Sequence, residues 1–242
     1  MSEASYKVHR IGLVNVSSFL IYRPGEAILV DCGNSGSEVK ILEVFKKLGL
    51  EPAMLKLLVL THSHYDHAGS AGRLKELTAC KVMIHRSEAE RLKKGYSSIP
   101  SGTRWKAKLL VALGRIVARR LMKYPGAVPD LLVEDLFDLE SFGFPGRVMH
   151  APGHTFGSML VLMEGGELIA GDTLFGVENK QHFPPFAEDL NALVNSWKYI
   201  HDLPVKTFYP AHGRHFSRES FLAEYESAMN RYGYASGGKT SG

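Results

Sequence analysis

The chain has 242 residues, of which 45% are hydrophobic and 22% charged, with a formal net charge of +4 at pH 7. This composition is ordinary for a globular protein with a sizeable core, and a membrane span is excluded because no apolar stretch approaches about 18 residues. Met1 is followed by Ser-Glu-Ala-Ser, and the two cysteines form no Cys-x-x-Cys pair. We therefore expect no secretory signal and a cytoplasmic location.

Apolar segments in the first half of the chain predict strands and helices in turn. Strands are predicted where the residues are apolar and β-branched, at residues 8–11, 14–22, 27–31, 55–60 and 81–84. Helices are predicted at about residues 37–48, near 69–77 and from Ser87 onward. A hairpin turn is expected at Arg23-Pro-Gly-Glu26, and Gly49 is expected to end the first helix.

A basic amphipathic segment distinguishes the middle of the chain. Between residues 104 and 123, apolar residues gather on one side of a helix, and Arg104, Lys108, Arg115 and Arg119 gather on the other. We interpret residues 93–140 as a helical insertion whose apolar stripe packs on the domain. Such a helix could also cover a functional site as a lid or form the face of a homodimer. Binding to an anionic membrane surface or to nucleic acid is the alternative.

Strands return in the second half of the chain. They are predicted at residues 147–150, 158–163, 167–171 and 207–210, with a hairpin at Glu164-Gly-Gly166 and a helix at residues 189–201. Because hairpins imply antiparallel pairing, the expected class is a layered α/β protein with mixed sheets. Residues 1–234 are expected to form a single domain, and the Gly/Ser-rich residues 235–242 a flexible tail.

Side chains that bind metals are concentrated directly after a predicted buried strand. Residues 61–67 read Thr-His-Ser-His-Tyr-Asp-His. In an extended segment His62, His64 and Asp66 would project to one side, whereas His67 needs a local bend. Imidazole and carboxylate groups are ligands suited to zinc, iron or manganese. This loop therefore predicts most of a two-metal site.

Three further candidate ligands follow predicted strands elsewhere in the chain. They are His154 after Pro-Gly, Asp172 after Ala-Gly, and His212 after Pro-Ala. Each is a weak signal alone, because turn histidines and Gly-Asp turns are common. Together with the loop at residues 61–67 they make four such features, and four in one chain indicate a metal site.

The ordered set His-x-His-x-Asp-His, His154, Asp172 and His212 resembles the metallo-β-lactamase superfamily over about residues 8–216. Glyoxalase II-like thioesterases and lactonases share this ligand set. The resemblance implies a four-layer αβ/βα sandwich, with two mainly antiparallel or mixed sheets and helices outside. It also implies a first metal held by His62, His64 and His154, and a second held by Asp66, His67 and His212, with Asp172 bridging them. Asp31 matches the aspartate that opens the pattern and is expected to steady the ligand geometry; a simple turn aspartate is the alternative.

The implied activity is hydrolysis with two divalent metal ions, zinc foremost and iron or manganese as alternatives. Metal binding lowers the pKa of water from about 15.7 to about 7 in favourable zinc sites. A hydroxide bridging the metals, with Asp66 and Asp172 as catalytic carboxylates, then attacks a carbonyl of a small ester, lactone or thioester. No nucleophilic side chain is needed, so Cys32 and Cys80 are interpreted as buried thiols.

Other functions within the superfamily remain as alternatives. A phosphodiesterase or nuclease is the runner-up because of the basic segment, although nucleic acid is not the favoured partner. A persulfide dioxygenase with one iron and a non-catalytic binding module are less favoured, because all seven ligands are present. Antibiotic hydrolysis is disfavoured, because the commonest β-lactamases carry Cys at the position of Asp172. Tyr65, His182 and His215 are candidates for contacting a small-molecule substrate or donating a proton.

Overall fold

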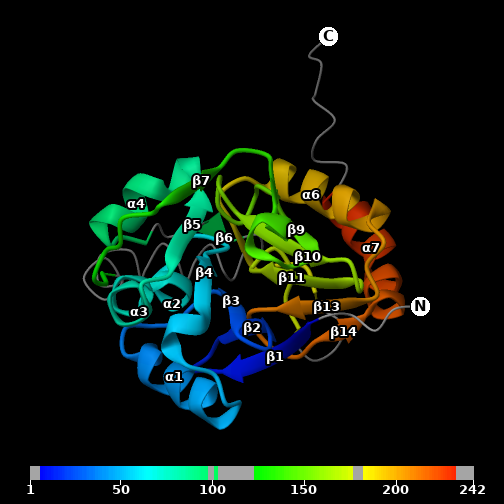
Figure 1. Cartoon of the computed structure of the whole chain (residues 1–242). Helices are drawn as coiled ribbons and strands as arrows, with labels where there is room; N and C mark the ends of the chain where they lie inside the picture. The colour runs from blue at the N-terminus through cyan, green and yellow to red at the C-terminus, as the bar shows by residue number, and fades with distance from the viewer. Residues whose placement is uncertain (1–5, 98–100, 103–122, 177–181, 233–242) are drawn as a thin grey trace.

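Two six-stranded sheets pack against each other in the computed structural model, which describes residues 6–97, 101–102, 123–176 and 182–232 (Figure 1). The first sheet has the order β1 (Lys7–Gly12), β2 (Ser17–Arg23), β3 (Glu26–Val30), β4 (Leu55–Val59), β5 (Lys81–His85), β7 (Leu131–Val133). The second has the order β14 (Phe216–Ser217), β13 (Thr207–Pro210), β11 (Glu167–Gly171), β10 (Met159–Met163), β9 (Gly146–His150), β8 (Leu136–Asp138). A small ribbon pairs β6 (Ser101–Gly102) with β12 (Phe186–Ala187).

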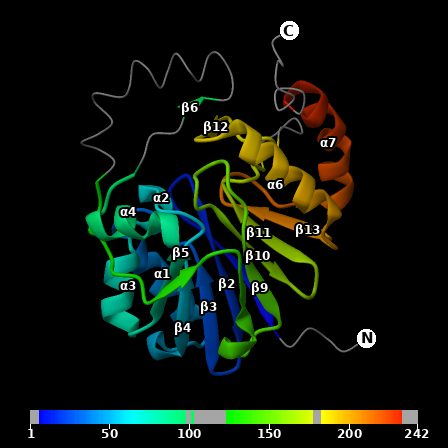
Figure 2. The same cartoon turned by 90° about the horizontal axis from the view of Figure 1, so that it is seen from above.

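Helices cover the outer face of each sheet (Figure 2). The first sheet is covered by α1 (Ser37–Lys47), α2 (Tyr65–Ala68), α3 (Ala71–Thr78) and α4 (Ala89–Lys94), and the second by α6 (Leu190–Asp202) and α7 (Arg218–Tyr232). Short 3-10 turns are η1 (Pro52–Met54), η2 (Arg86–Glu88) and η3 (Leu139–Phe142). None of the helices within the described ranges is long and apolar enough to cross a membrane. The four-layer sandwich predicted from the sequence is confirmed.

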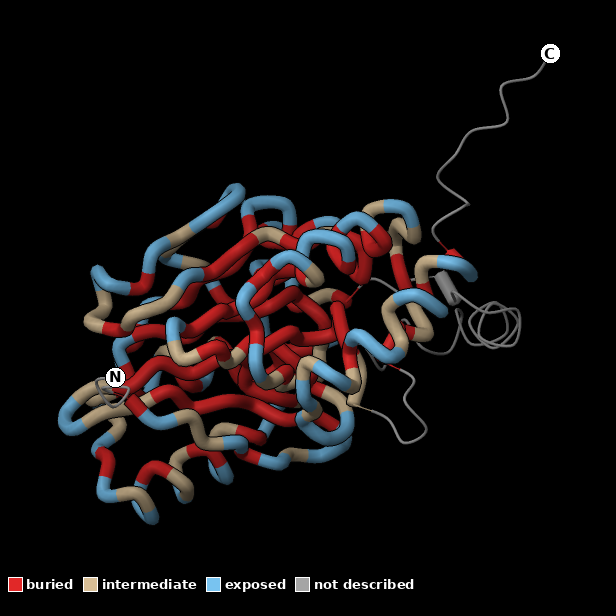
Figure 3. Tube along the Cα trace, turned by 90° about the vertical axis from the view of Figure 1, so that its right-hand side faces the viewer, coloured by how far each residue is buried: buried red, intermediate tan, exposed pale blue. Residues whose placement is uncertain are grey.

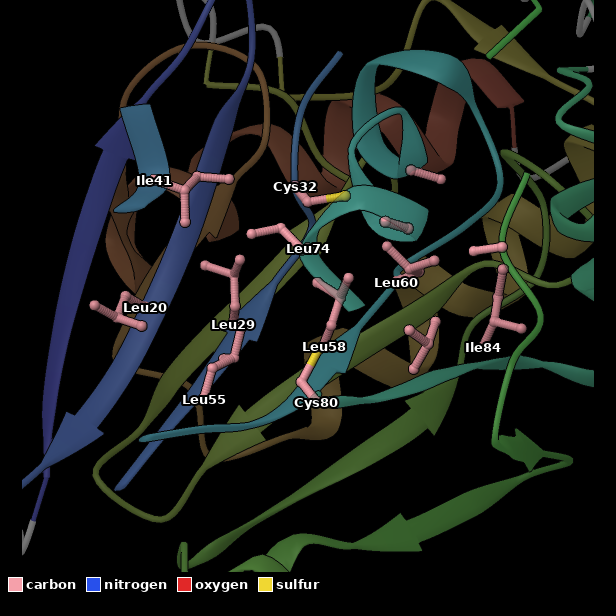
Figure 4. Packing of buried hydrophobic residues seen from close by; sticks show 14 of the residues in the cluster. Leu20, Leu29, Cys32, Ile41, Leu55, Leu58, Leu60, Leu74, Cys80 and Ile84 are labelled. Carbon is pink, nitrogen blue, oxygen red and sulfur yellow. The ribbon is translucent and has the colours of Figure 1, made fainter. Parts of the chain in front are cut away.

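Alternation along the strands distributes the apolar side chains over three cores. On β2, Leu20 belongs to the cluster beneath α1 and α3, whereas Phe19 and Ile21 belong to the cluster between the sheets. On β10, Leu160 packs with the cluster beneath α6, and Val161 lies between the sheets. Figure 4 shows the cluster beneath α1 and α3, and Figure 3 shows that buried residues run along the strands. Because successive side chains point to opposite faces, these continuous apolar runs bury both faces of the sheets at their central strands.

Strand direction places several strand exits at one edge of the sandwich. Strands β3, β4 and β5 are parallel neighbours, and β11 is parallel to β13. Strand β9 runs in the direction of β11, because both are antiparallel to β10. Backbone hydrogen bonds join the sheets near these exits, from Met159 N to Thr61 O (2.8 Å) and from Ser17 N to Ala211 O (2.8 Å). Loops of both sheets therefore meet at this edge.

The predicted strands and helices are present, with differences at some boundaries. The strand predicted at 14–22 was wrong at its start, because β2 begins at Ser17. Leu13 N donates to Val16 O, and Asn15 has φ 62°, so the chain turns there. The basic segment 104–123 lies outside the described residues except for its last position. Residues 131–138, which were included in the predicted insertion, form β7 and β8 and complete the two sheets.

A pair of substitutions on α1 tests the packing of the helix layer. Ile41 is fully buried and Val39 is 61% exposed on the same helix. We expect Ile41→Ala to lower the free energy of unfolding by about 2–5 kcal/mol, because it leaves a cavity. Val39→Ala should change it by less than about 0.5 kcal/mol. Urea unfolding followed by circular dichroism measures both, and equal effects would contradict the observed packing.

Candidate metal centre

Seven histidine and aspartate side chains converge at the edge where the strand exits meet. His62 and His64 follow β4, His154 lies between β9 and β10, and Asp172 and His212 follow β11 and β13. Their ligand atoms form three overlapping groups, and within each group all atoms lie within 4.8 Å of one another. The groups are His62–His64–His154, His62–His67–Asp172 and Asp66–His67–His212. The structure thus brings together every ligand candidate taken from the sequence.

The loop after β4 changes conformation between His64 and His67. His64 is extended, with φ −66° and ψ 149°, and α2 begins at Tyr65. Asp66 and His67 therefore leave the chain from a helical turn, which supplies the bend expected for His67. Asp66 is partly exposed, whereas His67 is fully buried.

Three imidazoles form the more buried side of the cluster. His64 Nδ1 lies 2.9 Å from His62 Nε2 and 3.1 Å from His154 Nε2. Burial lowers the pKa of His62 well below its usual range, and neighbouring histidines lower it further. Burial also lowers the pKa of His64, with His154 as the next cause. These two rings are therefore neutral at pH 7, which is the form that binds a metal ion.

Asp172 lies between the two sides of the cluster. Its Oδ1 is 3.2 Å from His67 Nε2 and 3.3 Å from His212 Nε2, and its Oδ2 is 3.4 Å from His154 Nε2. Burial acts to raise the pKa of Asp172, but His212, His67 and His154 together hold it well below its usual value. Burial acts to lower the pKa of His67, but the Asp172, Asp31 and Asp66 carboxylates raise it well above its usual value. Asp172 is thus a charged carboxylate that faces His154 on one side and His67 and His212 on the other.

Two buried atoms in the cluster have no hydrogen-bond partner among the residues that the structure describes. His67 Nε2 and Asp172 Oδ1 are close to each other, but their geometry is not that of a hydrogen bond. Leaving a buried polar group unsatisfied costs about 1–3 kcal/mol. A divalent cation would satisfy both atoms, and imidazole with carboxylate is a donor set for zinc, manganese or iron. The residues therefore fit a metal ion on the evidence of their own contacts.

Asp31 supports the loop that carries the ligands. Its Oδ1 accepts a hydrogen bond from Thr61 N (2.8 Å), and its Oδ2 accepts from Thr61 Oγ1 (2.8 Å) and His67 Nδ1 (2.8 Å). Asp31 is buried and has φ 58°, a region that Asp and Asn tolerate better than most residues. Since the Thr61 hydroxyl donates to Asp31, it accepts from His62 Nδ1 at 3.0 Å. Asp31 thus orients two of the imidazoles, as the resemblance implies.

Main-chain carbonyls orient two further rings. His154 Nδ1 donates to Phe186 O (3.1 Å), and His212 Nδ1 donates to Asn15 O (2.6 Å). Each bond leaves Nε2 directed at the cluster, which is how ligand histidines are commonly fixed. Sequence reasoning missed both partners, because a carbonyl oxygen carries no residue-type signal.

The remaining candidates lie outside the three ligand groups. His182 is buried; its Nδ1 donates to Phe175 O (2.9 Å), and its Nε2 lies 2.9 Å from Ser220 Oγ. Its contacts therefore act on the loop of Phe175, whose ring stacks on that of His212 at 5.1 Å. Tyr65 is partly exposed, and burial raises its pKa. His215 is exposed, and its ring lies 5.7 Å from that of Tyr209.

Replacing Asp31 with asparagine tests its contribution to metal binding. Asparagine tolerates the same backbone conformation but lacks the charge that attracts His67. We expect the metal affinity to fall about 10- to 100-fold with the fold retained. Competition with a chelator measures the affinity, and circular dichroism checks the fold. An unchanged affinity would leave Asp31 as a turn residue alone.

Comparisons with known proteins agree with this arrangement. A model of the metallo-β-lactamase superfamily matches residues 11–212. A probable metallo-hydrolase of Methanocaldococcus jannaschii is 26% identical over 198 residues, which cover 80% of this chain and 86% of that protein. The probable metallo-hydrolase YflN of Bacillus subtilis is 26% identical over 249 residues, which cover 95% of this chain and 92% of that protein.

Solved structures share the fold at lower identity. A metallo-β-lactamase family protein of Thermus thermophilus has a TM-score of 0.69 and 23% identity, covering 94% of this chain and 80% of that chain. The Rm3 metallo-β-lactamase has a TM-score of 0.66 and 21% identity, covering 93% of this chain and 90% of that chain. The match of the family model over most of the chain shows that this protein belongs to the metallo-β-lactamase superfamily and is a metal-dependent hydrolase.

Proposed function

We propose that this protein uses two divalent metal ions, most favourably zinc, to hydrolyse a small ester, lactone or thioester. The observation that carries the proposal is the set of three overlapping ligand groups at one edge of the sandwich. In this proposal His62, His64 and His154 hold one ion, and Asp66, His67 and His212 hold the other. Asp172 would serve both ions, since its Oδ1 approaches His67 and its Oδ2 approaches His154.

A bound pair of divalent cations supplies water activated near neutral pH and polarises the carbonyl under attack. The protein's own groups prepare this site. The neutral imidazoles of His62 and His64 leave their lone pairs available, and the charged carboxylate of Asp172 offsets the positive charge of the ions. Burial of the three histidines of the first group excludes water from that side.

The cysteines support metal chemistry over covalent catalysis. Cys32 is fully buried, and burial raises the pKa of its thiol well above the usual value. Its sulfur donates to His67 O at 3.1 Å, so it faces the backbone of the metal loop. Cys80 is also a free, buried thiol. Neither has the thiolate character of a nucleophile, and two free cysteines support a cytoplasmic location.

Exposed apolar side chains that neighbour ligand-bearing or ligand-supporting residues in the chain favour a carbonyl substrate. Val14 is 70% exposed and precedes Asn15, whose carbonyl holds His212. Phe156 is 53% exposed and lies two positions after His154. Both suit the apolar part of an ester or thioester better than a phosphodiester backbone. The basic segment, which favoured a phosphodiesterase, lies almost entirely outside the described residues.

Asp172→Ala tests the proposed bridging role. We expect the purified variant to lose metal content and its hydrolytic activity to fall by more than about 100-fold. Mutating a residue that only supports a ligand typically lowers metal affinity or activity about 10- to 100-fold, and Asp172 is proposed to bind both ions directly. Elemental analysis and turnover of lactone, thioester and bis-phosphodiester reporters measure these effects. Asp202→Ala is the matched control, since that side chain is 81% exposed.

The same assays on the unaltered protein separate the alternatives. Close to two metals per chain with turnover of a lactone or thioester supports the proposal. Turnover of the phosphodiester reporter alone would replace it with a phosphodiesterase. A single iron with no hydrolysis would indicate oxygen-dependent sulfur chemistry. Full metal occupancy and normal activity of Asp172→Ala would refute the bridging role.

A further inference from the structure

Glu88 is a fully buried carboxylate outside the three ligand groups. It ends η2, after β5, and its Oε2 accepts a hydrogen bond from Ser63 N at 3.3 Å and another from the Ser63 hydroxyl. Ser63 lies between His62 and His64 in the chain. Both hydrogen-bond donors of the residue that separates two ligands are therefore held by one carboxylate.

Arg91 extends this contact toward the second sheet. Its Nη1 lies 3.5 Å from Glu88 Oε1 and 2.8 Å from Glu188 Oε1. The Glu188 Oε2 accepts from Phe156 N at 2.9 Å, and Glu188 N donates to His154 O at 3.0 Å. A continuous path of polar contacts thus runs from Ser63 to His154.

Close packing joins the same two segments independently of charge. A Cβ atom added to Gly157 would lie 2.5 Å from Glu88 Cγ and 2.5 Å from Ser87 Oγ. Such distances are below ordinary contact, so the loop after His154 approaches the η2 segment as closely as a glycine allows. The polar path and this contact therefore both fix the distance between the η2 segment and the loop that follows His154.

We propose that Glu88, Arg91 and Glu188 form a positioning network that sets the distance between the His62–His64 segment and His154. This inference rests on the proposed function, since its purpose is to let the three imidazoles take up one ion. Zinc–nitrogen bonds are about 2.0–2.1 Å long, so a small shift of one segment breaks a three-histidine site. His62 and His64 follow a strand of the first sheet, whereas His154 lies between two strands of the second sheet.

The network is separate from the support that Asp31 provides. Asp31 contacts Thr61 and His67, before and after the pair of histidines that flank Ser63. In the network, Glu88 contacts Ser63 and Glu188 contacts the loop of His154, and Arg91 joins the two carboxylates. Glu88 is fully buried and Arg91 is partly exposed, and in some proteins such charged groups contribute more to a specific geometry than to stability. Loss of the network should therefore affect the three-histidine ion above all.

Titration of the metal-free, full-length protein with Co²⁺ tests this inference. Co²⁺ occupies sites of this donor type and reports its coordination through visible absorption. We expect Glu188→Gln and Arg91→Met each to weaken one of the two Co²⁺ sites by about 10- to 100-fold, with its absorption altered. Glu188→Gln is the gentler change, because an amide oxygen can still accept from Phe156 N. Arg91→Lys should restore part of the affinity, because it keeps the charge without the planar fork.

Arg86→Met is the matched control. Arg86 lies in η2, and its ion pair with Glu134 is exposed, with side chains 61% and 59% accessible. This variant should bind both Co²⁺ ions as the unaltered protein does. The melting temperature of each metal-free variant shows whether the fold is intact, and Glu188→Gln carries the test if Arg91→Met does not fold.

The outcomes separate this inference from the proposed function. If the unaltered protein binds two Co²⁺ ions and both network variants bind them equally tightly, the positioning network is refuted. If the variants weaken both sites equally and lower the melting temperature, the residues support the fold in general, which also refutes it. If the unaltered protein binds only one Co²⁺ ion, the two-metal proposal fails. The network is then still tested by the affinity for that single ion.

Discussion

The burial of several histidine and aspartate ligands at one edge is the constraint on which the rest of this structure depends. Burial lowers the pKa of His62, while carboxylates raise that of His67, although the two ring centroids are only 4.1 Å apart. Protonation therefore differs between neighbouring rings, and His67 Nε2 and Asp172 Oδ1 have no hydrogen-bond partner within the described part of the chain. Cations resolve this conflict where protons do not, because one ion accepts several lone pairs at once. The surrounding protein has to hold the ligands in place at the cost of their desolvation.

The four layers meet that requirement by placing the ligands at the strand exits. Both sheets are packed on their two faces, so side chains along the central strands are mostly apolar, and the ligands follow the strands instead. The two sheets are also joined by backbone hydrogen bonds at the same edge, from Met159 to Thr61 and from Ser17 to Ala211. Ligands from different sheets are thereby held at fixed separations, although they lie far apart in the sequence.

Local signals made the fold class and the ligands predictable from the sequence. Continuous apolar runs joined by a Gly-Gly hairpin predicted β10 and β11, and the crowding of residues 61–67 predicted the metal loop. Strands of two or three residues such as β7 and β14 were missed, because so short a segment has no measurable period. The network of Arg91 and Glu188 was missed for another reason. These residues are 97 positions apart, and neither stands in a recognisable motif. His182 shows the converse case: its proximity in sequence to Asp172 suggested a substrate contact, but its ring is directed at Phe175 and Ser220.

The way the ligands are held also indicates where substrate range can change. His154 and His212 are oriented by the carbonyls of Phe186 and Asn15, which are backbone atoms that survive most substitutions. Val14 and Phe156 stand beside these ligands in the chain, but their side chains are exposed and carry none of the contacts that orient the histidines. We expect substitution at either position to alter the surface offered to a substrate and to leave the imidazoles in place. Under the proposed function, chemistry and specificity then rest on different atoms of the same loops, which is how one fold can serve many substrates without losing its reaction.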